Sequence, residues 1–149
     1  MVAADAADVL AVQRAAFLIE GQLYDDPFLP PLVETVEQLL ADLGCGSGLV
    51  ALAGDRLVGS VRARLEGRTL HIARLAVAPD QQGRGLGSLL LARAEGVAPA
   101  EEALLFTGHR SASSLRLYSR AGYVEQRRAV VDDRVTLVYL RKQLSWAAA

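Results

Sequence analysis

The N-terminal part of the chain places its apolar side chains at helical spacing. A helix is predicted over about residues 5–20, with Asp5 as its N-cap and one apolar stripe formed by Val9, Val12, Ala16 and Ile19. Residues 21–32 contain three prolines, which end that helix. A second helix is predicted from about residue 32 to residue 43, and Gly44 follows as its C-terminal stop.

Further along, apolar and polar residues alternate with the period of β-strands. Three strands are predicted, divided by turns at residues 54–55 and 66–67. The third strand, residues 70–77, is apolar on both faces apart from His71 and Arg74. Because such a strand is buried on both sides, we expect it in the centre of a sheet.

The rest of the pattern predicts helices and strands in alternation and then a hairpin. The expected elements are a helix at residues 87–96, a strand at 103–107, a helix at 113–121 and two strands at 123–131 and 134–143. The predicted order is therefore ααβββαβαββ. We expect a single α/β domain over residues 1–149, with a central, mixed and mostly antiparallel sheet flanked by helices.

Composition narrows the class of protein. The net charge of −1 supplies no basic field for nucleic acid or for an anionic membrane surface. Cys45 is the only cysteine, which excludes an internal disulfide. The N-terminus lacks the basic and apolar regions of a signal peptide, and no run approaches about 18 apolar residues. We therefore expect a cytoplasmic protein without nucleic-acid or membrane partners, and the sequence leaves open whether it forms a homodimer.

A glycine-rich turn stands between the third predicted strand and the helix that follows it. The turn holds Gly83, Gly85 and Gly87, and exposed backbone N–H groups at the start of a helix bind phosphate well. It has no lysine for a P-loop, and Ser88 stands where a dinucleotide-binding fingerprint has its third glycine. Another kind of phosphate loop and a purely structural turn remain as interpretations.

Two motifs together resemble those of the GNAT superfamily of N-acetyltransferases. Residues 82–87, QGRGLG, follow Val77 and Pro79 and resemble that family's acyl-CoA pyrophosphate loop. Residues 114–123, SLRLYSRAGY, resemble its second signature, a helix carrying Leu-Tyr that is followed by glycine and an aromatic residue. The specific resemblance covers residues 70–123, and elsewhere the chain agrees with the family in the order of its elements.

The resemblance implies an acetyl-CoA-dependent N-acetyltransferase that acts on the amine of a small molecule or peptide, without a metal. Acetyl-CoA would be the acyl donor and co-substrate. The strand at residues 75–77 would leave its neighbour at a bulge, so that free amides pair with the pantetheine arm or stabilise an oxyanion. The donor-binding residues implied in this way are Leu75, Ala76, Val77, Gln82, Gly83, Arg84, Gly85, Leu86, Gly87, Ser88, Ser114 and Tyr118.

The same resemblance gives catalytic roles to Tyr118 and His71. Tyr118 is the candidate general acid, since phenols with a pKa near about 10 can protonate a thiolate whose thiol titrates near about 8.5. The alternative is a core tyrosine beside Leu115 and Ala121. His71 lies eleven residues before Gln82, where some family members carry a glutamate base. An imidazole could take that role directly or through water, or His71 could be a partly buried structural histidine.

One position departs from the family pattern. Members often carry an asparagine four or seven residues before the tyrosine, and serines stand there in this chain, Ser114 and Ser111. Serine still donates a hydrogen bond, so a contact with the donor arm is retained as an expectation. His109 is a weaker candidate for the base. A catalytically weak acyl-CoA-binding or sensing module is the alternative function.

The acceptor side is defined less sharply. Tyr24 and Phe28 precede or follow the prolines of the first loop, and they would either form a wall of the acceptor site or cover the sheet edge. Four carboxylates in the same region would attract a cationic amine or are ordinary surface charges: Glu20, Asp25, Asp26 and Glu34. The sequence does not choose between these interpretations.

Overall fold

The computed structural model describes residues 1–145. Within that range, the helices are α1 (Ala6–Leu23), α2 (Pro30–Val33), α3 (Val36–Gly44), α4 (Leu86–Glu95) and α5 (Ala112–Arg120). The strands are β1 (Ser47–Ala53), β2 (Arg56–Glu66), β3 (Thr69–Val77), β4 (Glu102–Gly108), β5 (Val124–Val130) and β6 (Thr136–Gln143). Short 3-10 turns precede α1 at Ala3–Asp5 and follow β3 at Pro79–Gln81.

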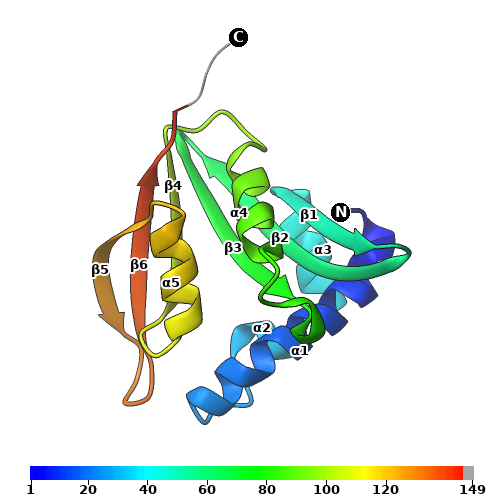
Figure 1. The fold of residues 1–149 in the computed structure, drawn as a ribbon, viewed down its shortest axis with the longest axis horizontal. Helices are drawn as coiled ribbons and strands as arrows, with labels where there is room; N and C mark the ends of the chain where they lie inside the picture. The colour runs from blue at the N-terminus through cyan, green and yellow to red at the C-terminus, as the bar shows by residue number, and fades with distance from the viewer. Residues whose placement is uncertain (146–149) are drawn as a thin grey trace.

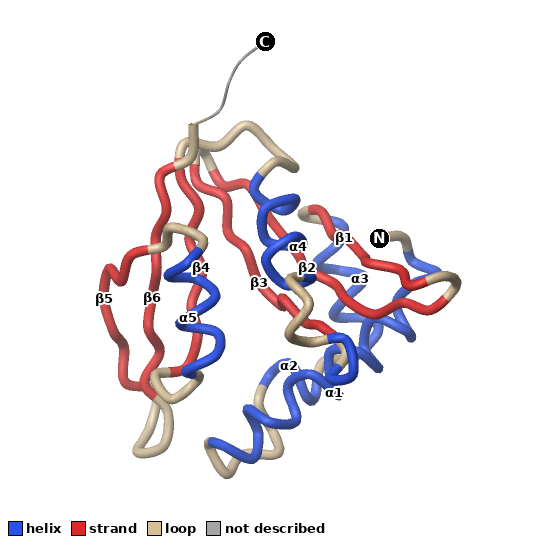
Figure 2. The backbone as a smooth tube through the Cα atoms, in the orientation of Figure 1, coloured by secondary structure: helices blue, strands red, loops and turns tan. Residues whose placement is uncertain are grey.

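The strands form one six-stranded sheet in the order β1-β2-β3-β4-β6-β5, drawn in red in Figure 2. Every neighbouring pair is antiparallel except β3 and β4, which run parallel. β3 therefore lies inside the sheet, as its two apolar faces predict. The predicted α/β fold with a mixed, mostly antiparallel sheet is confirmed.

Helices cover both faces of the sheet. α4 and α5 lie on the near face in Figure 1, and their apolar side chains share a core with the inward residues of four strands, Val61, Leu70, Leu105 and Val138 among them. α1 and α3 pack on the opposite face, in a second core that includes Val9, Leu39, Val58 and Ala76. Within residues 1–145 the second core reaches β1, β2 and β3, so α1 and α3 cover the β1–β3 half of that face.

The prediction of one continuous helix over residues 32–43 is wrong. The backbone is extended at Glu34 and Thr35, with ψ of 135° and 163°, and the chain forms α2 and α3 instead. Thr35 Oγ1 accepts from the backbone N–H of Gln38, whose side chain accepts in return from the Thr35 N–H. Because of this capping box, α3 begins about one helical turn later than predicted, and Glu34 is turned toward the sheet.

Glu34 forms a buried ion pair with Arg62 of β2. The two guanidinium terminal nitrogens lie 3.0 and 2.7 Å from the carboxylate oxygens, and Gln13 Nε2 donates to the same carboxylate at 2.8 Å. Burial alone raises the pKa of Glu34, but the hydrogen bonds from Arg62 and Gln13, with the charges of Arg62 and Arg74, outweigh it and lower the pKa. The pair thereby fastens α1 and the α2–α3 junction to β2.

Candidate active site

The two halves of the sheet part between β3 and β4. Their parallel ladder consists of three residue pairs and ends where His71 faces Leu104. Beyond that pair the ribbons diverge, and the C-terminal half of α1 lies at their open end (Figure 1). We call this region, between residues 72–77 of β3 and 105–108 of β4, the β3–β4 opening.

A bulge in β3 lies beside the β3–β4 opening. On β2, Ser60 pairs with Ala76 but Arg62 pairs with Ala73, so two residues of β3 face a single residue of β2. The first of them, Arg74, has a φ of 56°, which re-aims the following backbone. Residues 75–77 consequently have no ladder partner on the β4 side of β3 within residues 1–145.

The glycine loop lies at the start of α4, next to the end of β3. Gly83 and Gly85 have φ of 77° and 81°, and a Cβ at either position would meet nothing within 4 Å. Gly85 is the N-cap of α4, no side chain caps it, and the first turn carries no acid. Gln82 Nε2 donates to the Val77 carbonyl at 3.0 Å and ties the loop to β3. The exposed amides and the positive end of the helix dipole suit a phosphate.

Tyr118 lies in α5, the helix that follows β4. Its ring packs on the core of the near face and lies 6.0 Å, centroid to centroid, from the ring of Tyr123. Among residues 1–145, no group accepts or donates a hydrogen bond at the Tyr118 hydroxyl. Burial, and secondarily the negative charge of Glu20, raises the pKa of Tyr118 to about 12. The phenol is therefore protonated across the neutral range.

The two serines that replace the family's asparagine differ in their surroundings. Ser111 is buried, donates to the Glu20 carboxylate and lies 2.9 Å from the Tyr24 hydroxyl, so its hydrogen-bonding capacity is used within the protein. Ser114 is half-buried in the first turn of α5, facing no side chain that takes up its hydroxyl in the described part of the chain. Of the two, only Ser114 keeps a free hydroxyl.

Tyr24 and Phe28 do not share one surface. Tyr24 is 3% exposed, and its hydroxyl accepts the Arg110 N–H at 2.9 Å, whereas Phe28 is 75% exposed. Tyr24 thus joins the end of α1 to the β4–α5 loop across the open end. Arg134 strengthens this junction from the β5–β6 hairpin by donating to the Asp25 carbonyl at 2.6 Å.

His71 lines a groove of about 370 Å³ together with Arg64, Leu104, Phe106 and Tyr139. The alternation along β3 and β4 puts these side chains on the face opposite α4 and α5. His71 Nε2 lies 3.2 Å from Glu66 Oε2, and the side chain is 40% exposed. Leu75 follows four residues later, roughly 10–13 Å along the strand, so His71 lies too far from Leu75 for direct contact.

The other histidine is engaged elsewhere. His109 Nδ1 accepts the Thr136 N–H at 3.0 Å and so fixes the β4–α5 loop to β6. Within residues 1–145 there is no group of three or more histidine, cysteine, aspartate or glutamate side chains placed to hold a metal ion. In the same range, no helix combines the length and the apolar character needed to span a membrane.

The sequence reasoning missed one connection. Glu20 was one of four carboxylates without a distinguishing signal, yet it is the one that Ser111 fixes beside α5. The contact joins residues far apart in the chain, and no periodicity reports such a contact. Tyr24 and Gly108 form a second contact of this kind.

Comparison with known proteins identifies the family. The family model described as an acetyltransferase (GNAT) domain matches residues 32–144, which is most of the chain. The protein therefore belongs to the GNAT acetyltransferase family, and it is an acyltransferase by family. A search of curated proteins finds no match.

Solved structures share the fold at low sequence identity. PaiA N-acetyltransferase from Thermoplasma acidophilum, in complex with coenzyme A, has a TM-score of 0.79 and 17% identity over 97% of this chain and 96% of that one. A putative acetyltransferase from Salmonella typhimurium, with acetyl-CoA, has a TM-score of 0.76 and 20% identity, and the match covers 100% of this chain and 94% of that one. The ribosomal-protein-S18-alanine N-acetyltransferase from Escherichia coli has a TM-score of 0.78 and 16% identity, and the match covers 99% of this chain and 93% of that one. At these identities the likeness concerns the fold.

Proposed function

We propose that this protein transfers an acetyl group from acetyl-CoA to the primary amine of a small molecule or peptide, as one N-acetyltransferase domain over residues 1–149. The observation that carries the proposal is the β3–β4 opening, which has the glycine loop on one side and the unpartnered Tyr118 hydroxyl on the other. Together with the GNAT family match, this arrangement supports binding sites for the pyrophosphate, the pantetheine arm and the thioester of the donor.

The donor lies across α4 and along β3 in this proposal. The amides of the glycine loop, with the exposed Arg84 and Ser88, receive the pyrophosphate. The free edge of β3 at residues 75–77 pairs with the pantetheine arm, and Ser114 donates to the same arm from α5. An amide at Leu75 or Ala76 then stabilises the negative charge that develops on the thioester oxygen.

In the proposed reaction the neutral amine attacks the thioester carbon and the C–N bond forms. When the C–S bond breaks, its electron pair goes to sulfur, and the Tyr118 hydroxyl gives that sulfur its proton. The phenolate takes back a proton from the nitrogen, which becomes the amide nitrogen. A raised pKa makes a phenol a weaker acid, but the same burial destabilises the thiolate, so both groups are shifted in one direction.

Attack requires that the acceptor first lose its ammonium proton. We propose that His71 takes this proton through ordered water, because its side chain faces the groove on the acceptor side but lies too far from the bulge for direct contact. Glu66, at 3.2 Å from Nε2, fixes the imidazole orientation. No proton transfer is assigned to His109, whose Nδ1 is occupied by the Thr136 N–H.

The test is release of free thiol when the purified protein is mixed with acetyl-CoA and a panel of amines. The panel contains benzylamine, amino acids, polyamines and short peptides with free N-termini. We expect thiol release that depends on the amine and an acetylated product of matching mass. Tight acetyl-CoA binding without transfer to any amine would instead support the alternative function of an acyl-CoA-binding or sensing module.

A further inference from the structure

One carboxylate at the β3–β4 opening, Glu20, has no cationic partner among the described residues. Glu20 is half-buried near the end of α1, and among residues 1–145 no arginine, lysine or histidine nitrogen forms a salt bridge with it. Glu34, the other acid turned toward this region, is by contrast paired with both ends of the Arg62 guanidinium. A partly buried, unpaired carboxylate strongly favours a cation beside it.

A chain of hydrogen bonds fixes Glu20 in place. The Arg110 N–H can only donate, so the Tyr24 oxygen accepts there. Ser111 uses its single hydroxyl hydrogen on Glu20 Oε2, which leaves Tyr24 to donate its own hydrogen to Ser111. Every hydrogen in the chain therefore points toward the Glu20 carboxylate, and that oxygen accepts without a proton of its own.

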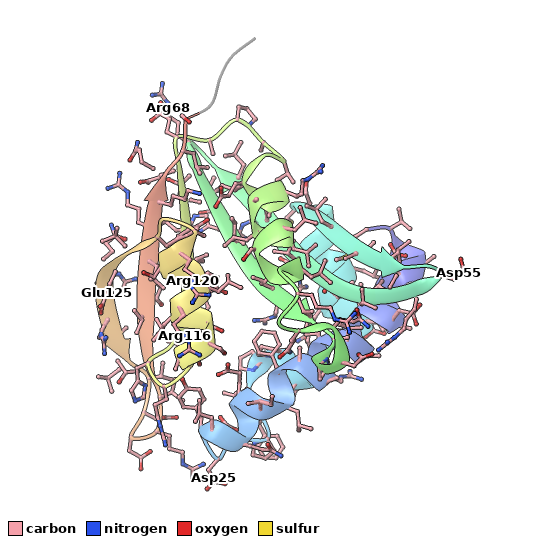
Figure 3. All side chains as sticks on the ribbon, in the orientation of Figure 1. Asp25, Asp55, Arg68, Arg116, Arg120 and Glu125 are labelled. Carbon is pink, nitrogen blue, oxygen red and sulfur yellow. The ribbon has the colours of Figure 1, made fainter. Side chains whose placement is uncertain are left out.

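The second oxygen of this carboxylate stays available. Glu20 Oε1 accepts no hydrogen bond from the described part of the chain, and the Tyr118 hydroxyl has no partner there either. Glu20 is bonded to Ser111, the N-cap of α5, and Tyr118 lies on the same helix about two turns further on, so both groups belong to the α5 side of the opening. Arg116 and Arg120 of α5, labelled in Figure 3, are exposed, and within residues 1–145 neither forms a salt bridge with Glu20.

We propose that Glu20 binds the ammonium group of the acceptor and holds it beside Tyr118, at the level of the thioester. The inference rests on the proposed function and makes the acceptor class more specific: an amine that binds in its protonated, ammonium form. Glu20 acts as an anchor in this assignment, and the proton still leaves through water toward His71. The role predicts that Glu20 contributes to acceptor affinity and leaves the binding of acetyl-CoA unchanged.

The test compares wild type with Glu20→Gln on two acceptors of nearly equal shape. Benzylamine is a cation at about pH 7.5, and O-benzylhydroxylamine is neutral there because its nitrogen is far less basic. The glutamine keeps the acceptor oxygen for Ser111 and removes only the charge. We expect KM for benzylamine to rise at least tenfold, which is about 1.4 kcal/mol, and KM for O-benzylhydroxylamine to change less than about threefold. If another panel amine is preferred, that amine and its O-alkylhydroxylamine form the pair.

Asp25→Asn is the matched control, because it removes the same charge from the adjacent loop. Asp25 lies at the outer tip of that loop in Figure 3, and asparagine tolerates its φ of 51°. We expect this variant to treat both acceptors as wild type does. The affinity of Glu20→Gln for acetyl-CoA, measured by calorimetry, is expected to equal that of wild type and shows that the donor site is intact.

Each outcome has a separate meaning. Equal loss on both acceptors, or no loss on either, overturns the assignment of Glu20 while leaving amine acetylation in place. A wild-type protein that acetylates no amine overturns the proposed function itself. If Asp25→Asn also raised KM for benzylamine selectively, the effect would come from the general negative charge at the entrance. That result overturns the assignment of Glu20 as the residue that binds the ammonium group.

Discussion

The ring of Tyr24 occupies the space that a side chain at Gly108 would fill. A Cβ built on Gly108 lies 2.0 Å from the Tyr24 hydroxyl oxygen and 2.5 Å from its Cζ. The close approach lets the hydroxyl reach the Arg110 N–H and Ser111 at 2.9 Å each. The last residue of β4 therefore has to be glycine for α1 to close the open end of the sheet.

Gly108→Ala is expected to displace Tyr24 and to lower the free energy of unfolding by about 1–3 kcal/mol. Urea denaturation measures the loss. In a Tyr24→Ala background the obstructing ring is gone, so the same substitution is expected to cost little, and the double-mutant cycle reports the coupling. Gly44→Ala serves as control, since a Cβ there meets nothing within 4 Å. Equal costs in both backgrounds would contradict the packing argument.

Glu34→Gln is expected to cost about 3 kcal/mol at neutral pH, because it leaves the buried Arg62 charge with a weaker partner. The pKa of Glu34 is lowered in the folded protein, so its stabilisation is present above the ordinary carboxyl pKa of about 4.3 and is lost as the pH falls through the folded value. The gap between wild type and variant is therefore expected to narrow in acid. Urea titrations at a series of pH values test this.

The control for that prediction is Glu37→Gln. Glu37 is an exposed acid in the first turn of α3, and its loss is expected to change stability by less than about 0.5 kcal/mol at any of these pH values. If the difference in unfolding free energy between wild type and Glu34→Gln stayed constant down to the acid transition, this would show that protonation of Glu34 does not weaken the ion pair.

Gly85→Glu is expected to weaken acetyl-CoA binding at least tenfold, about 1.4 kcal/mol, because it puts bulk and negative charge where the pyrophosphate is proposed to lie. Gly85→Asn is the matched control, since asparagine tolerates the φ of 81° and brings no charge. Arg84→Ala is expected to cost less than Gly85→Glu because the amides carry much of the contact. Calorimetry that gives wild-type affinity for a folded Gly85→Glu protein would remove the loop from the donor site.

His71→Ala is expected to change the acidic limb of the pH profile of kcat/KM while acetyl-CoA affinity stays near that of wild type. The reason is that the imidazole lines the groove proposed to receive the acceptor and does not line the glycine loop. Glu66→Gln tests the partner of the imidazole and is expected to move the same limb by a smaller amount. An unchanged profile in His71→Ala would make His71 a structural residue.

Most of the sheet could be predicted because its signals are local. Glycine at a turn, alternation along β2 and the apolar β3 each depend on neighbours a few residues away. The break between α2 and α3 also had a local signal, since Thr35 and Gln38 have the spacing of a capping box. The apolar periodicity across that box outweighed it and led to one helix where the chain forms two.

The polar contacts of the site could not be predicted in the same way. Arg62 alternates with apolar residues as a solvent-facing strand residue would, yet it is 4% exposed because α1 and the α2–α3 junction cover it. Glu20 meets Ser111 only once the chain has folded. The sequence motif predicted the loop and Tyr118 as site residues, and the packing of α1 puts Glu20, of the four carboxylates, in contact with Ser111 at the start of α5.

The most direct test of the account is the rate of acetyl transfer by Tyr118→Phe. The substitution keeps the ring and its packing on Tyr123 and removes one transferable proton. In single-turnover experiments, where chemistry is observed directly, we expect the rate to fall by about 10²–10⁴-fold while the acetyl-CoA dissociation constant stays within about twofold. A transfer rate within about threefold of wild type would contradict the account, because the sulfur would then obtain its proton without Tyr118.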